Sequence, residues 1–93
     1  MEFTEHKPIY LQISDKVCDR IVNKEWNADE RIPSVRELGA ELGVNPNTIM
    51  RTYEHLQNKE IIQNKRGVGY FVSTDAKDKI IAIQREQFMN EDL

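Results

Sequence analysis

The residues best suited to chemistry in this 93-residue chain lie in one stretch, GVNPNTIMRTYEHL, which spans residues 43–56. Apolar side chains recur there at helical spacing and define the inner face of a helix. The opposite face is polar and carries Asn47, Arg51, His55 and, just beyond the stretch, Asn58, with Thr48 and Met50 at its sides and Glu54 also pointing outward. Asparagine, threonine and arginine are side chains that bind base edges and phosphates, so this face predicts contact with nucleic acid.

The same stretch carries a clear signal for the start of its helix. Asn45 is a preferred N-cap, because its side-chain oxygen accepts a hydrogen bond from an unpaired N–H of the first turn. Pro46 fits the first helical position, where the N–H that proline lacks is not needed. We expect the helix to run to about residue 58 and to bury Ile49, Tyr53 and Leu56.

A shorter helix is predicted directly before this one. Ser34 and Glu37 have the spacing of a capping box, in which the hydroxyl and the carboxylate each satisfy a backbone N–H. Gly43 stands where a C-cap glycine ends a helix, and Gly39 inside the helix indicates close packing with a neighbour. Two short helices joined in this way, the second with a polar outer face, are typical of a helix-turn-helix, whose second helix enters the major groove.

Residues 61–72 predict a β-hairpin. Two short apolar segments, 61–64 and 70–72, flank a glycine-bearing turn. Lys65 and Arg66 stand side by side at the tip and form a small cationic finger. A hairpin that follows a helix-turn-helix is a wing, which is well placed to contact phosphates or the minor groove.

The two outer segments predict further helices. Residues 8–25 have apolar side chains on two sides, which indicates a helix covered on two sides, and residues 26–33 read as an irregular connection. Residues 76–90 return to helical spacing, with a stripe that favours a dimer contact or a contact with the first helix over a ligand pocket. The stripe consists of Ile80, Ile83 and Phe88. The fold class is therefore mainly α with a small β-hairpin, a winged helix-turn-helix followed by a C-terminal helix.

Four segments together resemble the GntR family of bacterial transcription regulators, and within it the short YtrA-type branch. They are PIYLQI at 8–13, RIPSVREL at 31–38, the GVNPNTIMRTYEHL stretch and RGVGYFV at 66–72. The resemblance implies a homodimer that binds an inverted-repeat operator in double-stranded DNA, usually as a repressor, and the polar start and single cysteine of the chain make a cytoplasmic location the default expectation. The family's DNA contacts fall here on Ser34, Arg36, Asn45, Asn47, Thr48, Arg51, Arg66 and Gly67, to which the cationic tip adds Lys65.

The sequence departs from the family pattern at three positions. Many members have an arginine where this chain has Pro46, and another where it has Met50, so two base contacts are absent. Asp29 stands where the family usually has glycine, and aspartate tolerates the left-handed backbone of such a turn. The resemblance also divides the chain into a DNA-binding domain, residues 1–74, and a C-terminal helix, residues 75–93, belonging to a small dimerisation appendage. Either the natural protein ends at Leu93 or that appendage is incomplete.

The composition is typical of a small domain without a membrane span. It gives only weak evidence about the binding partner. The net charge is −3, yet residues 34–74 hold five Lys or Arg against four Asp or Glu, so the middle of the chain permits a local anionic partner. No apolar run reaches the roughly 18 residues that span a bilayer. The single cysteine, Cys18, predicts a packed side chain rather than a redox sensor.

Because the net charge of the whole chain is negative, one alternative stays open, a winged-helix module that binds protein and not DNA. An enzyme is not supported, because the sequence offers no paired carboxylates, nucleophile–base set, phosphate loop or metal-ligand spacing. No catalytic residue, metal or cofactor is predicted. So little chain lies outside the DNA-binding unit that we expect no large pocket for a small-molecule effector.

Overall fold

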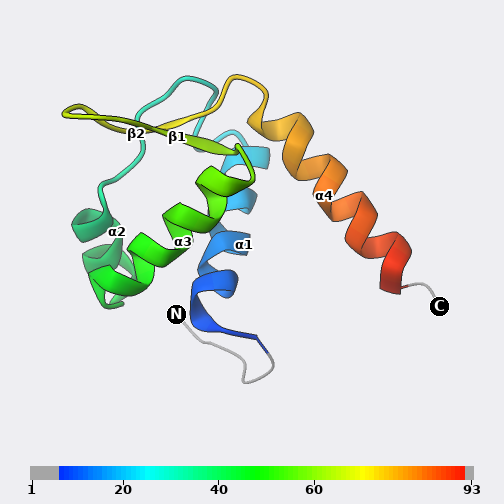
Figure 1. The fold of residues 1–93 in the computed structure, drawn as a ribbon, viewed down its shortest axis with the longest axis horizontal. Helices are drawn as coiled ribbons and strands as arrows, with labels where there is room; N and C mark the ends of the chain where they lie inside the picture. Colours follow the sequence, from blue (N-terminus) through cyan, green and yellow to red (C-terminus); the bar gives the residue numbers. More distant parts are fainter. Residues whose placement is uncertain (1–6, 92–93) are drawn as a thin grey trace.

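A computed structural model of the chain describes residues 7–91, with side chains as far as residue 86. These residues form four helices and one two-stranded antiparallel sheet (Figure 1). The elements in chain order are α1 (Ile9–Val22), α2 (Val35–Leu42), α3 (Pro46–Asn58), β1 (Ile62–Lys65), β2 (Gly69–Val72) and α4 (Ala76–Glu91). The predicted fold class is confirmed, and α3 ends at the predicted residue.

Helix α1 ends earlier than the sequence predicted, at Val22 instead of residue 25. The N–H of Lys24 donates to the carbonyl of Ile21 at 3.1 Å, and the N–H of Glu25 donates to that of Arg20 at 2.8 Å. This pair of bonds is a Schellman motif, and Lys24 takes its left-handed position with φ 66°. Because glycine usually holds that position, a lysine there gave no signal that the helix would stop.

The turn between α2 and α3 follows the predicted signals closely. Ser34 and Glu37 make both bonds of the capping box, and Gly43 ends α2 in the left-handed conformation with φ 68°. Asn45 caps α3, its side-chain oxygen accepting from the N–H of Asn47 at 2.8 Å. A Cβ on Gly39 would lie 2.7 Å from the carbonyl oxygen of Val44, so the close packing expected at this glycine is confirmed.

The connection between α1 and α2 is more regular than predicted, because part of it pairs with β2. The N–H of Asp29 donates to Val72 at 2.9 Å and that of Ile32 to Tyr70 at 2.9 Å, while Val72 donates to Glu30 at 3.0 Å. The connection thus covers the free edge of β2, whose other edge pairs with β1. Asp29 has φ 63°, so the left-handed geometry expected at this position is confirmed.

The core lies where α1, α2, α3 and the hairpin meet. Tyr53 is fully buried at its centre, and its hydroxyl donates to the carbonyl of Pro33 at 2.7 Å. Its ring meets that of Tyr70 edge to face, with centroids 4.7 Å apart. The prediction that Tyr53 is a core residue is confirmed. The fully buried side chains around it come from all three helices and both strands, and include Ile13, Val17, Leu38, Ile49, Leu56, Ile62 and Val72.

Helix α4 begins on this core and then leaves it. Ala76 and Ile80 are buried at 1% exposure, whereas Ile81 is 37% exposed. The helix contacts α1 near its start, and Figure 1 shows it extending away from the rest of the molecule. The second apolar side of α1, predicted to be covered, therefore faces α4.

The Schellman motif of α1 generates a prediction about stability. Replacing Lys24 by Gly should raise the free energy of unfolding by about 0.5–1 kcal/mol, because glycine adopts the left-handed conformation without steric strain. The same replacement at Lys16, an exposed position inside α1, should lower it by about 1 kcal/mol. Urea unfolding of both variants measures the difference, and a loss of stability in both would contradict this account of the helix end.

Candidate nucleic-acid interface

The N-terminal half of α3 presents the polar face that the sequence predicted. Asn47 and Arg51 are exposed, Met50 is 46% exposed between them, and Thr48 is half-buried. The cap formed by Asn45 occupies its side-chain oxygen but leaves its amide N–H₂ group to donate outward. The first turn therefore offers the side-chain amide groups of Asn45 and Asn47, which suit an anionic or base-edge partner, while the backbone N–H groups of Asn47, Thr48 and Ile49 are already bonded to Asn45.

Arg51 is not a freely extended side chain. Its guanidinium carbon lies 4.5 Å from the centroid of the Tyr10 ring in the first turn of α1. The same ring meets His55 edge to face, with centroids 6.0 Å apart. His55 was predicted on the outward face of α3, but the structure has it half-buried against α1, so that prediction is corrected. Being one turn after Arg51, His55 shares the edge of α3 that α1 covers.

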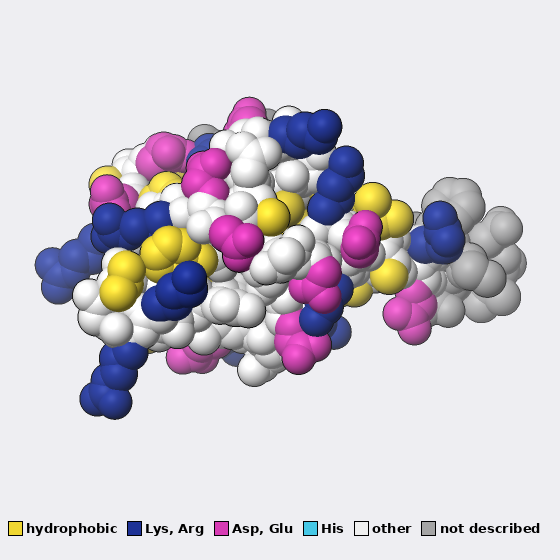
Figure 2. All heavy atoms as spheres, turned by 90° about the horizontal axis from the view of Figure 1, so that it is seen from above, with side chains coloured by type: hydrophobic (Ala, Val, Ile, Leu, Met, Phe, Trp, Pro, Cys, Tyr) yellow, Lys and Arg dark blue, Asp and Glu magenta, His cyan; other side chains and the backbone are white. Residues whose placement is uncertain are grey.

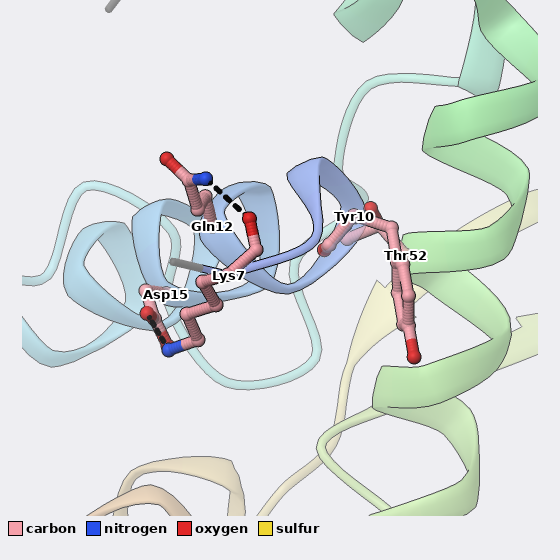
Figure 3. Close-up of polar contacts among 5 residues, drawn as sticks. All are labelled: Lys7, Tyr10, Gln12, Asp15 and Thr52. Carbon is pink, nitrogen blue, oxygen red and sulfur yellow. Dashed lines mark hydrogen bonds and ion pairs between the residues drawn. The ribbon is translucent and has the colours of Figure 1, made fainter. Parts of the chain in front are cut away.

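Thr52, for which the sequence predicted no role, is fully buried between these two helices. Its hydroxyl oxygen lies 2.9 Å from the Tyr10 carbonyl oxygen and 3.1 Å from that of Thr48. Figure 3 shows Thr52 of α3 directly beside Tyr10 of α1. A polar threonine that follows the exposed Arg51 looks like surface from the sequence, and its apolar neighbours one turn away, Ile49 and Leu56, are the hint of burial.

The start of α2 brings two predicted contacts to the surface. Arg36 is exposed, and Ser34 is half-buried with its hydroxyl oxygen accepting the N–H of Glu37 at 3.1 Å. The Ser34 N–H in turn donates to the Glu37 carboxylate at 3.0 Å, and this bond, followed by the interaction with the Ser34 side chain, holds the pKa of Glu37 below its ordinary value. The carboxylate next to Arg36 is thus committed to the helix start.

The tip of the hairpin carries the remaining predicted contacts. Lys65, Arg66 and Gly67 are exposed, and Gly67 has φ 82°, which favours glycine in this turn. The Lys65 ammonium lies 4.4 Å from the centroid of the Phe71 ring, on the outer face of the sheet. This cation–π contact holds the Lys65 ammonium against the hairpin.

Arg31 is a cation at the base of the wing that sequence reasoning missed. It forms a bridge with Phe71, and its Nε atom would lie 2.9 Å from a Cβ added to Gly69. Its place follows from the pairing of the α1–α2 connection with β2, which the sequence had suggested was irregular. In the sequence, the only signal of this pairing was the charged Arg31 followed by the apolar Ile32, which the structure exposes and buries in turn.

These elements place cations at one end of the molecule. Figure 2 shows Lys and Arg side chains extending from the end that carries the hairpin and α2, opposite α4, with acidic side chains scattered over the same view. The start of α2, the start of α3 and the wing are three separate segments of the chain. The fold brings these three segments to the same end of the molecule. A protein that binds DNA needs such an arrangement, because it contacts the duplex at several points along the backbone.

A narrow cleft lies away from this end, between α1, α3 and α4. Its volume is about 230 Å³, below the roughly 300–1,000 Å³ of ordinary ligand sites. Cys18 lines it, and burial, followed by the charge of Asp15, raises the pKa of this thiol to about 12. The thiol therefore stays protonated, which agrees with a packed side chain and not with a reactive one.

Two kinds of feature that would point to another class of protein are absent from the residues that the structure describes. No group of three or more His, Cys, Asp or Glu side chains has the arrangement of a metal site. Likewise, no helix between residues 7 and 91 is long and apolar enough to cross a membrane. The arrangement of the elements defines a winged helix-turn-helix domain of the DNA-binding type.

The comparison with protein families assigns the chain more closely. Residues 9–72 match the model of the bacterial regulatory proteins of the gntR family, and the chain belongs to that family. It is 40% identical to the uncharacterized HTH-type transcriptional regulator YhcF of Bacillus subtilis, covering 97% of this chain and 79% of YhcF. It is 34% identical to the HTH-type transcriptional repressor YtrA of the same organism, covering 80% of this chain and 57% of YtrA. The predicted family and YtrA-type resemblance are confirmed.

Solved structures agree with this assignment. A putative GntR-family transcriptional regulator from Bacteroides thetaiotaomicron is 48% identical, with a TM-score of 0.81 over 91% of this chain and 73% of that one. The DNA-binding domain of AraR, solved in complex with operator ORR3, is 25% identical, with a TM-score of 0.70 over 78% of this chain and 88% of that one. The chain is thus a winged helix-turn-helix transcription regulator.

His55 generates a prediction about pH. Burial, and then the charge of Lys59, lower the pKa of His55 below its ordinary value of 6.5. As the pH falls through 6.5 the unfolded chain gains a proton at His55 that the folded chain does not take up, so the free energy of unfolding should fall. Urea unfolding at about pH 7.5 and pH 5.5 measures this loss. The His55→Gln variant should lose less stability between the two values, and an equal loss would contradict the pKa shift.

Proposed function

We propose that this regulator binds an inverted-repeat operator as a homodimer and represses transcription in the cytoplasm, without an enzymatic activity of its own. The observation that carries the proposal is the bare polar face at the start of α3, next to the exposed cations of α2 and the wing. The AraR complex supports a DNA partner for this fold, and the name of YtrA supports repression.

In this proposal α3 reads sequence in the major groove. Asn47 and Arg51 project from the exposed face, and Thr48 stands at its edge, so their side chains meet base edges or the phosphates that flank them. Asn45 presents its side-chain amide N–H₂ group to a phosphate at the start of α3. Pro46 and Met50 contribute shape and apolar contact where relatives of this family carry arginine.

The other predicted contacts hold the domain on the DNA backbone. Arg36 and the Ser34 hydroxyl lie at the start of α2, and the wing contributes Lys65, Arg66 and the backbone of Gly67. Arg31 adds a further cation at the base of the wing. Such contacts fix the position of the recognition helix on the duplex and carry little sequence information themselves.

The dimer in this proposal is built by α4, the appendage that follows the DNA-binding domain of residues 1–74. Of the predicted stripe, Ile80 is buried in the core of its own chain, which leaves it as a contact to the winged unit. Ile83 is half-buried and Ile81 is 37% exposed, so these two side chains are open to a second copy. Phe88 lies outside the side chains that the structure describes. Solution mass, measured by light scattering, tests the dimer.

The test of DNA binding is selection of bound sequences from a random duplex pool. An inverted repeat with half-sites about one helical turn apart supports a dimer with two recognition helices. A module that binds protein instead of DNA would recover no preferred sequence.

Binding to the selected sequence should depend strongly on salt. If each subunit neutralises five or six phosphates, the dissociation constant should rise by orders of magnitude between roughly 50 and 200 mM salt. Fluorescence anisotropy with a labelled duplex measures the slope of log Kd against log salt. A dissociation constant that does not change with salt would contradict backbone contacts by the α2 and wing cations.

Arg51 should contribute to both affinity and sequence preference. Its replacement by Ala should weaken binding to the selected sequence by about 1–3 kcal/mol and relax the preference at one position of each half-site. Replacing Arg85, an exposed arginine of α4, by Ala removes the same charge away from the interface and should change binding little. An equal loss on every sequence would reassign Arg51 from a base to a phosphate.

A further inference from the structure

Tyr10 is not among the predicted DNA contacts, yet its ring lies against the recognition helix. Tyr10 belongs to the first turn of α1, but the centroid of its ring lies 4.5 Å from the Arg51 guanidinium carbon, and the ring meets that of His55 in a T-shaped contact. Arg51 and His55 are one turn apart on α3, so Tyr10 fits between two successive side chains of the recognition helix. Tyr10 is half-buried, and Arg51 above it stays exposed.

The backbone of Tyr10 is held in place by α3 and by its own surroundings. Its carbonyl oxygen lies 2.9 Å from the hydroxyl of Thr52, the neighbour of Arg51 in sequence. The segment before α1 is tied back as well, since the Gln12 side chain donates to the Lys7 carbonyl at 2.7 Å. Figure 3 shows these contacts side by side, together with the ion pair of Lys7 and Asp15. These contacts fix the backbone of Tyr10, and the contact with His55 restricts its ring.

A support of this kind matters because arginine has many rotamers. A freely moving Arg51 would lose that freedom on contacting DNA, which weakens binding. A planar guanidinium stacked on a ring keeps its N–H groups available at its edges while its orientation is already restricted. A ring that restricts Arg51 in this way lowers the entropic cost of the contact.

The surface around the pair is continuous between the two helices. Pro8 and Ile9 of the α1 start, with Asn47, Thr48 and Arg51 of α3, line a shallow hollow whose side is the Tyr10 ring. The side chains expected to meet DNA thus share a surface with the start of α1. The direction of the Arg51 side chain therefore depends on its contact with α1 as well as on its position in α3.

We propose that Tyr10 is a positioning residue for Arg51, holding its guanidinium over the ring so that the base preference of α3 depends on the first turn of α1. This inference rests on the proposed role of Arg51 in DNA binding. It predicts that the aromatic face matters and the hydroxyl does not. Tyr10→Phe should therefore behave as the wild type, and Tyr10→Leu should not.

The contact itself is tested on the free full-length chain, without DNA. In NMR spectra of the ¹⁵N-labelled protein, the Arg51 side-chain Nε–Hε signal, assigned by its loss in Arg51→Lys, should be shifted upfield by the Tyr10 ring. The shift should persist in Tyr10→Phe and disappear in Tyr10→Leu. An unchanged Arg51 signal in Tyr10→Leu would overturn the proposal whatever the DNA results.

The consequence is tested with the selected duplex and the corresponding mutant pairs. Tyr10→Leu should weaken binding about two- to fivefold and relax the preference at the same operator position as Arg51→Ala, whereas in the Arg51→Ala background it should have no further effect. His55→Gln removes the other contact of the ring and serves as the matched control, with binding close to the wild type. Thermal unfolding of each variant shows that the domain is intact, and Tyr10→Met replaces Leu if it is not.

The outcomes separate the two proposals. If Arg51→Ala binds as the wild type does, the proposed role of Arg51 fails. If Arg51→Ala weakens binding but Tyr10→Leu weakens it equally in both backgrounds, Tyr10 acts by another route and the positioning role is overturned. A loss in Tyr10→Phe as large as in Tyr10→Leu would assign the effect to the hydroxyl and overturn it too.

Discussion

The recognition helix is fixed by two hydrogen bonds from adjacent residues to two different parts of the molecule. Thr52 reaches the Tyr10 carbonyl of α1, and Tyr53 reaches the Pro33 carbonyl at the entry to α2. Adjacent side chains on a helix point about 100° apart, so the two bonds set both the tilt and the rotation of α3. With its inner side committed in this way, the helix can expose a polar face with a defined orientation. The wing and the α2 start are then placed relative to that face.

An acidic protein that binds DNA must keep its negative charges out of the way, and this chain does so by internal pairing. Of the four acidic residues between positions 34 and 74, Glu37 belongs to the capping box, Glu41 pairs with Arg20 and Glu60 with Lys79. Glu54 is exposed on α3, nearly two turns from the helix start. Surface ion pairs contribute little stability, so their main effect here is to leave the cations of the α2 start and the wing as the dominant local charge.

Much of the fold could be predicted because its signals are local. The Ser34–Glu37 box, the cap at Asn45 and the glycine at position 43 each act within a few residues, and all three are confirmed. The prediction failed where a residue took an unusual backbone conformation, as Lys24 does at the end of α1. It also failed where pairing was distant in sequence, as between the α1–α2 connection and β2. The individual DNA contacts, from Ser34 to Gly67, remain predictions that the structure places on the surface without testing.

The sequence alone determined the family, the order of the elements and the polar face of α3, because each depends on residue types at short spacing. Only the tertiary structure decided how that face is supported. It moved His55 against α1, buried Thr52, placed Tyr10 beneath Arg51 and brought Arg31 to the wing. Each of these contacts joins residues far apart in the chain, or turns a side chain toward a neighbouring helix. Helical spacing shows which side chains share a face, but the elements that cover that face are known only once the chain has folded.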